Sequence, residues 1–226
     1  MSAGFRRSLV SVLRGQASQL VLSSSLALLL LGARVIGTRQ HDYLFLVWNL
    51  FLAWVPYAVA LAIRGLHRRR ARALMLLPLF ALWLGFLPNA PYLVTDFVHL
   101  RYRVGAPLWF DAVMLASFAW AGVGLGAASL RMCSHVVRVR HGSLAAAAFV
   151  PLAALATGFG IYLGRFVRLN TWDVATRPST VLAHVFSPLA HPFGHPQAWI
   201  VTLTFALFFV VAYLANGHTR SPAREP

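Results

Sequence analysis

The stretch FLPNAPYLVTD, residues 86–96, ends an apolar run that begins near residue 73. A helix over residues 73–87 rises only about 22 Å, so it breaks before it has crossed about 30 Å of hydrocarbon. The two prolines remove backbone N–H donors and disfavour helical conformation in the residues before them. Irregular backbone at that depth is tolerated only inside protein or beside water. The stretch therefore predicts a broken membrane span.

Composition places the whole chain in the membrane class. Hydrophobic residues make up 59% of the 226 residues and charged residues only 11%, which is too little charge for the surface of a soluble domain. The sequence predicts an all-α fold, a polytopic transmembrane helical bundle of about six spans, the third of them broken. By the length rule the spans lie near residues 17–36, 43–63, 73–93, 107–130, 143–167 and 198–215.

We expect one membrane domain, residues 17–215, with an N-terminal arm, 1–16, and a C-terminal tail, 216–226. The connection between spans five and six has apolar residues at helical spacing from Val181 to Phe186, after Pro178. This pattern predicts an interfacial helix in the headgroup plane. The first span lacks a clear small-x-small cleavage site after Leu31, so we expect it to be retained.

The arginines set the expected orientation. All 20 basic residues are arginine, and 13 of them fall at the two termini and in the 64–72 and 131–140 connections, against seven on the opposite side. The positive-inside rule then places both termini, and with them the arm and the tail, in the cytoplasm. We expect these arginines to meet anionic headgroups of the lipid bilayer and not nucleic acid, because no basic domain lies outside the membrane.

The aspartates gather on the other face, and with them the candidate catalytic residues. Asp96 belongs to the first motif, and Asp173 ends a second motif, GRFVRLNTWD, residues 164–173; Asp42 and Asp111 lie on the same face. Because acidic residues are rare in this chain, we interpret Asp96 as functional. Asp96, His99 and Asp173 are candidate acid/base or cation-binding groups. On a helix after the break, Tyr92, Asp96, His99 and Arg103 share one face.

The candidate ligand-binding residues flank these groups. Two arginines at the outer end of the fifth span are suited to a phosphate or carboxylate. The predicted ligand set is Asn89, Tyr92, Arg165, Arg168, Asn170 and Trp172. Asn89 has two interpretations: it caps a new helix whose positive end attracts an anion, or it satisfies backbone freed by a proline kink. We predict no metal site, because the chain has one cysteine and its His184, His191 and His195 lie in a proline-rich stretch.

The same residues have a purely structural interpretation. Ion pairs can join Arg165 and Arg168 to three aspartates, Asp96, Asp111 and Asp173. Asn49 then makes an interhelical hydrogen bond. Two glycine pairs at four-residue spacing, 122/126 and 160/164, allow close helix packing, which we assign to the bundle itself in preference to dimerisation. This pattern does not decide whether the protein forms a homo-oligomer.

The two motifs resemble a bacterial integral-membrane family catalogued as domain of unknown function 1361. Residues 86–100 and 164–173 carry the resemblance, together with the Trp-Asn and Trp-Val-Pro elements of residues 43–57, and it covers about residues 40–215. Relatives have Trp-Asn-Ser-Trp-Asp where this chain has Leu-Asn-Thr-Trp-Asp at 169–173. The resemblance implies a multi-pass protein of the bacterial inner membrane. It brings no activity, and the cofactors stay unknown.

Three functions fit these patterns. The first is a polar site at the extracytoplasmic face that binds or processes an anionic or lipid-linked substrate. The second is a membrane scaffold or assembly subunit whose motifs are helix locks, that is, ion pairs and hydrogen bonds that hold helices together. The third is a small solute or ion transporter, which is disfavoured because the inner halves of the spans contain almost no ionisable residue.

Overall fold

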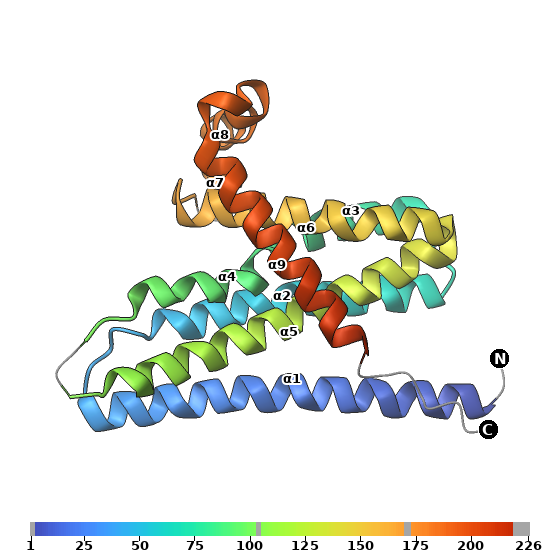
Figure 1. Cartoon of the computed structure of the whole chain (residues 1–226). Coiled ribbons are helices and arrows are strands. Elements are labelled where there is room, and N and C mark those ends of the chain that lie inside the picture. Colours follow the sequence, from blue (N-terminus) through green and yellow to red (C-terminus); the bar gives the residue numbers. More distant parts are fainter. Residues whose placement is uncertain (1–2, 103–104, 170–172, 219–226) are drawn as a thin grey trace.

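The computed structural model describes residues 3–102, 105–169 and 173–218 (Figure 1). The predicted helical bundle is confirmed, because six helical segments of the described residues are long and apolar enough to cross a membrane. The elements are α1 (Ala3–Thr38), α2 (Phe45–Arg68), α3 (Ala73–Phe86), α4 (Asn89–Tyr92), the 3₁₀ helix η1 (Leu93–His99), α5 (Leu108–His141), α6 (Ser143–Arg165), α7 (Asp173–Thr176), α8 (Pro178–Ala190), the 3₁₀ helix η2 (Pro192–Gly194) and α9 (Pro196–His218).

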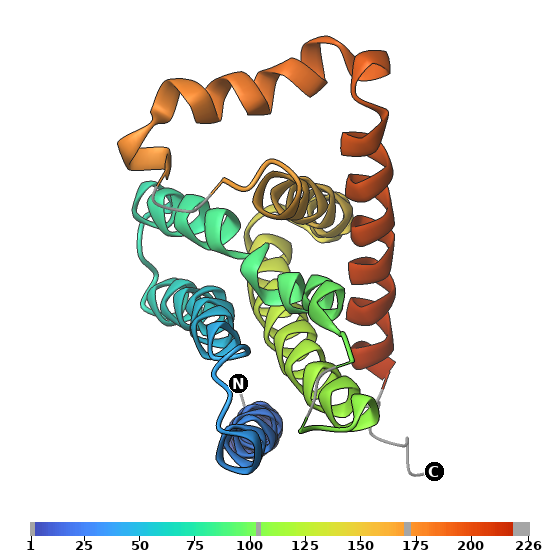
Figure 2. The ribbon, with the colours of Figure 1, turned by 90° about the vertical axis from the view of Figure 1, so that its left-hand side faces the viewer.

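The long helix α5 forms the centre of the bundle. It packs against α1, α2, α6 and α9 and also against α4 and η1, and its side chains Leu115, Phe118 and Leu125 are fully buried. Figure 2 shows α5 between α1 on one side and α6 on the other. We call the end of the bundle that contains Thr38, η1 and the start of α5 the motif end, and the opposite end the arginine-rich end.

The third span is broken, as the first motif predicts. Helix α3 stops at Phe86, four residues of α-helix follow as α4, and the chain then tightens into η1. Pro88 and Pro91 donate no backbone hydrogen bond. The Asn89 Nδ2 group donates to the freed Phe86 carbonyl oxygen at 3.1 Å. Of the two interpretations of Asn89, the structure therefore has the proline kink with a satisfied backbone, and α4 has no side-chain cap.

Both glycine pairs pack against the broken segment. A Cβ atom at Gly122 would lie 2.3 Å from the Ala90 carbonyl oxygen, and one at Gly160 would lie 2.4 Å from Pro88 Cγ. The second members are close too, because a Cβ at Gly126 would lie 3.1 Å from Ala90 Cβ and one at Gly164 would lie 3.2 Å from the Tyr92 ring. Helices α5 and α6 thus enclose the break from two sides, which assigns the glycines to packing within the bundle.

The fourth span is longer than predicted. We expected it to end near residue 130 and a loop to cover 131–140, but α5 continues to His141. Only Gly142, with a φ of 92°, separates α5 from α6. The loop prediction was wrong because a helix can continue past the apolar span when its arginines find partners: Arg140 donates to the Ala71 carbonyl oxygen at 2.6 Å and to His67 Nδ1 at 3.1 Å. These contacts fix the arginine-rich end of α5 to the α2–α3 connection.

The connection between α6 and α9 contains the predicted helix, α8, with Pro178 as its first residue. It contacts α7 and η2 before the chain enters α9. Figure 2 shows α8 running across one side of the bundle, outside the packed helices. Leu182 and Phe186 are exposed, as suits an apolar face turned away from the bundle.

Candidate functional site

A buried carboxylate, Asp96, lies at the centre of the motif end. Its side chain is only 1% exposed. The Asn49 Nδ2 group, from α2, donates to Asp96 Oδ2 at 3.0 Å, and the Arg165 Nη2 group, from the last turn of α6, forms an ion pair with Oδ1. Each carboxylate oxygen therefore has a partner from a different helix.

The Arg165 guanidinium also binds the rest of this segment. Its Nε donates to Thr95 Oγ1 at 2.8 Å, and its Nη1 lies 3.3 Å from His99 Nε2. The guanidinium carbon lies 4.6 Å from the centroid of the Tyr92 ring, a cation–π distance. The Thr95 hydroxyl in turn donates to the Tyr92 carbonyl oxygen at 2.6 Å. One arginine from α6 thus contacts both α4 and η1.

Two pairs of side chains three residues apart meet Arg165. Residues three apart are eclipsed in a 3₁₀ helix. Asp96 and His99 therefore share one face, and Thr95 follows Tyr92 at the same spacing. The stripe predicted from the sequence left out Thr95, although residues three and four apart lie on the same face of an α-helix, and it extended to Arg103, which lies outside the described residues.

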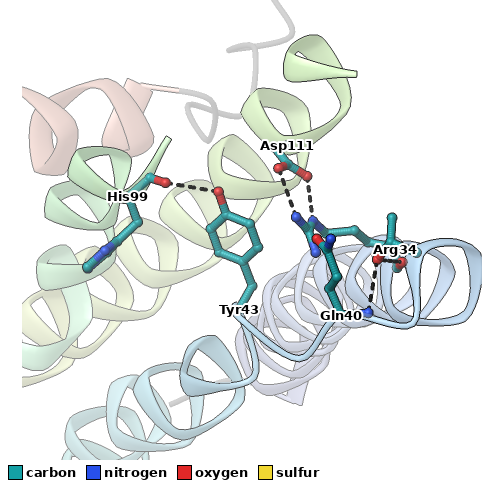
Figure 3. A network of polar contacts seen from close by, with 6 residues as sticks. Arg34, Gln40, Tyr43, His99 and Asp111 are labelled. Carbon is teal, nitrogen blue, oxygen red and sulfur yellow. Dashed lines mark hydrogen bonds and ion pairs between the residues drawn. The ribbon is translucent and has the colours of Figure 1, made fainter. Parts of the chain in front are cut away.

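A second buried ion pair lies beside the first. Arg34 of α1 meets Asp111, in the first turn of α5, with its Nε 2.7 Å from Oδ1 and its Nη2 3.3 Å from Oδ2 (Figure 3). The two side chains are 0% and 1% exposed. Asp111 therefore has the structural, ion-paired role of the alternative interpretation, but its partner is Arg34 and not Arg165 or Arg168. The register of α1 against α5 brings Arg34 to Asp111 instead.

Tyr43 connects the two ion pairs. Its hydroxyl donates to the His99 carbonyl oxygen at 2.9 Å, while its ring centroid lies 4.5 Å from the guanidinium carbon of Arg34. Figure 3 shows the tyrosine between these two partners. The His99 ring packs edge-on against Phe45 at 4.9 Å between centroids. The resulting network, which we call the motif-end network, joins residues of α1, α2, η1, α5 and α6.

Two of the remaining predicted site residues, Arg168 and Asp173, follow the end of α6. Arg168 follows α6 in a left-handed conformation, with a φ of 64°, and is exposed. Asp173 begins α7, where its carbonyl oxygen accepts the backbone N–H of Arg177 at 2.8 Å. Asn170 and Trp172 lie outside the described residues. The joint site of Asp96 with Asp173 therefore stays a prediction.

Sequence reasoning missed three members of the network: Arg34, Tyr43 and Thr95. Arg34 was counted only as a topological charge, although an arginine four residues before the end of a span already lies at a depth where a partner is needed. Tyr43 entered only through the family resemblance. Thr95, three residues after Tyr92, lies on the face of the predicted stripe but was left out of it.

The charges of the network are paired between different helices. Each buried carboxylate meets one guanidinium, so neither pair leaves a net charge in the bundle. Asp111 in the first turn of α5 and Arg165 in the last turn of α6 also face the helix ends that favour their charges. Within the described ranges, no three His, Cys, Asp or Glu side chains lie close enough together to hold a metal ion.

The comparisons with known proteins assign a family. The family model described as "Protein of unknown function (DUF1361)" matches residues 48–212, which include both motifs. No curated protein matches the chain. No solved structure matches it either.

Proposed function

The chain belongs to the family of domain of unknown function 1361, and since that family brings no activity, we propose from the geometry that it is a membrane scaffold or assembly subunit whose motifs are helix locks. One observation carries the proposal: Asp96 and Asp111 are each 1% exposed and each pairs with its own arginine. A carboxylate that acts as a base or binds a cation must be within reach of its substrate. These two carboxylates instead form ion pairs with arginines of other helices, Arg165 and Arg34.

The role of the two motifs follows from what they join. The first motif supplies the break in the third span, with Pro88, Tyr92 and Asp96, and the second supplies Gly164 and Arg165. Arg165 contacts three side chains of the broken segment and stacks on Tyr92. The two motifs thus form the two sides of one contact between the third and fifth spans. The partner surfaces of a scaffold would then lie on the lipid-facing sides of the helices.

We place the protein in the bacterial inner membrane with the arginine-rich end and both termini in the cytoplasm. The support is the excess of arginine at that end, 13 residues against seven. A C-terminal fusion to a fluorescent protein that matures only in the cytoplasm tests the orientation, and fluorescent cells are the expected result. Alkaline phosphatase activity from a C-terminal fusion to that enzyme, which folds only outside the cytoplasm, contradicts it.

The test of function separates folding from chemistry at Asp96. A strain that lacks the chromosomal gene is complemented with Asp96→Asn, with the wild type and with Gly85→Ala as a folding-neutral control. We expect any loss of complementation to follow the amount of folded protein in the membrane. A variant Asp96→Asn that is folded at the wild-type level but fails to complement refutes the scaffold proposal.

Asp96→Asn alone can fail to fold, and a second variant covers that outcome. Asp96→Leu/Arg165→Met removes both charges together, and apolar replacement of a whole buried pair is often neutral for stability. Complementation by this folded double variant supports a purely structural role. A folded double variant without complementation shows that the charges themselves are needed and overturns the proposal.

A second candidate function is an anion-binding site at the motif end. It is favoured by the 18% exposure of the Arg165 side chain and by the exposed Arg168 three residues further on. A phosphate or a lipid-linked substrate would meet these arginines from outside the bundle. Loss of complementation in folded Arg168→Gln, with wild-type stability, distinguishes this function from the scaffold, in which Arg168 has no role.

A further inference from the structure

A groove on the arginine-rich side of the bundle lies apart from the motif-end network. Helices α1, α5 and α9 line it, and its volume is about 530 Å³. That volume falls in the range of small-molecule sites, about 300–1,000 Å³. Its polar lining is Gln16, Gln19, Arg131 and Asn216.

The lining changes from polar to apolar with depth. Gln16 on α1 and Asn216 on α9 are the lining residues nearest the arginine-rich end, and Arg131 lies on α5. Toward the middle of the spans the lining becomes Leu20, Val123 and Trp120. Ser23 also lines this part, but its hydroxyl donates to the Leu20 carbonyl oxygen of its own helix at 3.0 Å. The deeper wall is therefore apolar.

The depth of the groove matches one leaflet. Arg131 and Trp120 are eleven residues apart on α5, which corresponds to about 16 Å of helix. Half of the hydrocarbon thickness is about 15 Å. A groove with a cationic outer end and an apolar lower wall over this distance has the polarity profile of a phospholipid. The described lining includes a guanidinium and no acidic side chain, so the complementary headgroup is anionic.

Arg131 is held where it can face such a headgroup. Its Nη1 donates to the Tyr213 carbonyl oxygen at 2.9 Å, and its guanidinium carbon lies 5.5 Å from the Tyr213 ring centroid. These contacts to α9 fix the side chain at the groove, where Arg131 is partly exposed, and the planar guanidinium group suits a phosphate. Gly124 lines the floor of the groove, where an added Cβ would meet only Leu20 Cδ2, at 3.1 Å.

We propose that this groove binds one anionic phospholipid of the leaflet at the arginine-rich end, with the phosphate at Arg131 and one acyl chain along Leu20, Val123 and Trp120. The site is independent of the motif-end network and of its proposed role. The lipid would fill the space between α1 and α9, two helices that pack against different sides of α5.

Native mass spectrometry of the purified protein tests the proposal, with dioleoyl phosphatidylglycerol and dioleoyl phosphatidylcholine as the probes. We expect one tightly bound phosphatidylglycerol and weaker binding of the zwitterionic lipid. Arg131→Gln should weaken phosphatidylglycerol binding roughly tenfold, the effect of losing one charge-assisted hydrogen bond. Gly124→Leu should block both lipids because it fills the groove. Arg138→Gln, an exposed arginine of the same helix outside the groove, is the matched control and should bind like the wild type.

Each other outcome overturns the proposal. Equal losses in Arg131→Gln and Arg138→Gln indicate general charge attraction, and unchanged binding in Gly124→Leu shows that the groove is not the site. Protection of the buried Cys133 from a maleimide confirms that each variant is folded. If Gly124→Leu does not fold, Leu22→Trp fills the groove from its 68% exposed rim, with the same expected loss.

Discussion

Adding one methyl group at Gly122 should weaken the whole bundle. The Cβ atom of Gly122→Ala would lie 2.3 Å from the Ala90 carbonyl oxygen and 2.7 Å from Leu93 Cδ1, whereas real Cβ atoms essentially never come within 3.0 Å of another group. The closer contact is with backbone, which has no rotamer to change. Helix α5 and the broken segment must therefore separate by at least the difference, 0.7 Å.

The magnitude follows from two opposing effects. Overpacking of a dense interior costs about 1–3 kcal/mol. Alanine is up to about 1 kcal/mol better than glycine inside a helix. We therefore expect Gly122→Ala to destabilise the fold by about 1–2 kcal/mol, and Gly160→Ala, against Pro88, by a similar amount. Gly85→Ala is the control, because its Cβ would meet nothing within 4 Å. The control should be as stable as the wild type or slightly more stable.

The chain contains its own reporter of unfolding. Cys133 is the only cysteine and is 0% exposed within α5, so a fluorogenic maleimide reacts with it only after the helices separate. Heating the purified protein with the dye should give a midpoint that is lower by roughly 2–8 °C for Gly122→Ala. A midpoint for Gly122→Ala that equals that of Gly85→Ala would refute the packing of the broken segment against α5.

The same assay tests three further contacts. Asp111→Ala leaves Arg34 buried without its carboxylate and should lower the free energy of unfolding by about 3–5 kcal/mol. The double variant Arg34→Met/Asp111→Leu should recover most of that loss. Equal instability of the single and the double variant contradicts the ion pair. Tyr43→Phe loses one hydrogen bond but keeps its ring on the guanidinium, so we expect a cost of about 1 kcal/mol and a clearly larger one for Tyr43→Leu. Asn89→Leu should cost about 1–3 kcal/mol, because it leaves a carbonyl of the kink unsatisfied, and wild-type stability of this variant contradicts that role.

Much of the fold could be predicted from the sequence because membrane spans obey a length rule. The six spans, the break at Pro88 and the helix after Pro178 all follow from apolar length and from the chemistry of proline. The end of the fourth span could not be predicted in this way. Arginine marks an interface in a hydropathy pattern, but a helix continues through it when the side chains find partners, as Arg140 does.

The site was predicted only in part because ion-pair partners depend on packing. The sequence placed Asp96, His99 and Arg165 at one face, and the structure brings these three together. It did not offer Arg34 as partner of Asp111, since that pairing depends on how α1 lies against α5. Thr95 was missed although it follows Tyr92 by three residues and so lies on the face of the predicted stripe.

The central claim, that Asp96 and Arg165 form a helix lock, is tested most directly by a double-mutant cycle of Asp96→Leu and Arg165→Met with the Cys133 assay. The account predicts that each single variant is destabilised, that the double variant is more stable than either, and that the coupling energy is roughly 1–3 kcal/mol. Two single effects that add within about 0.5 kcal/mol would show that the two side chains are energetically independent. Asp96 would then be free for chemistry, and the scaffold account would be contradicted.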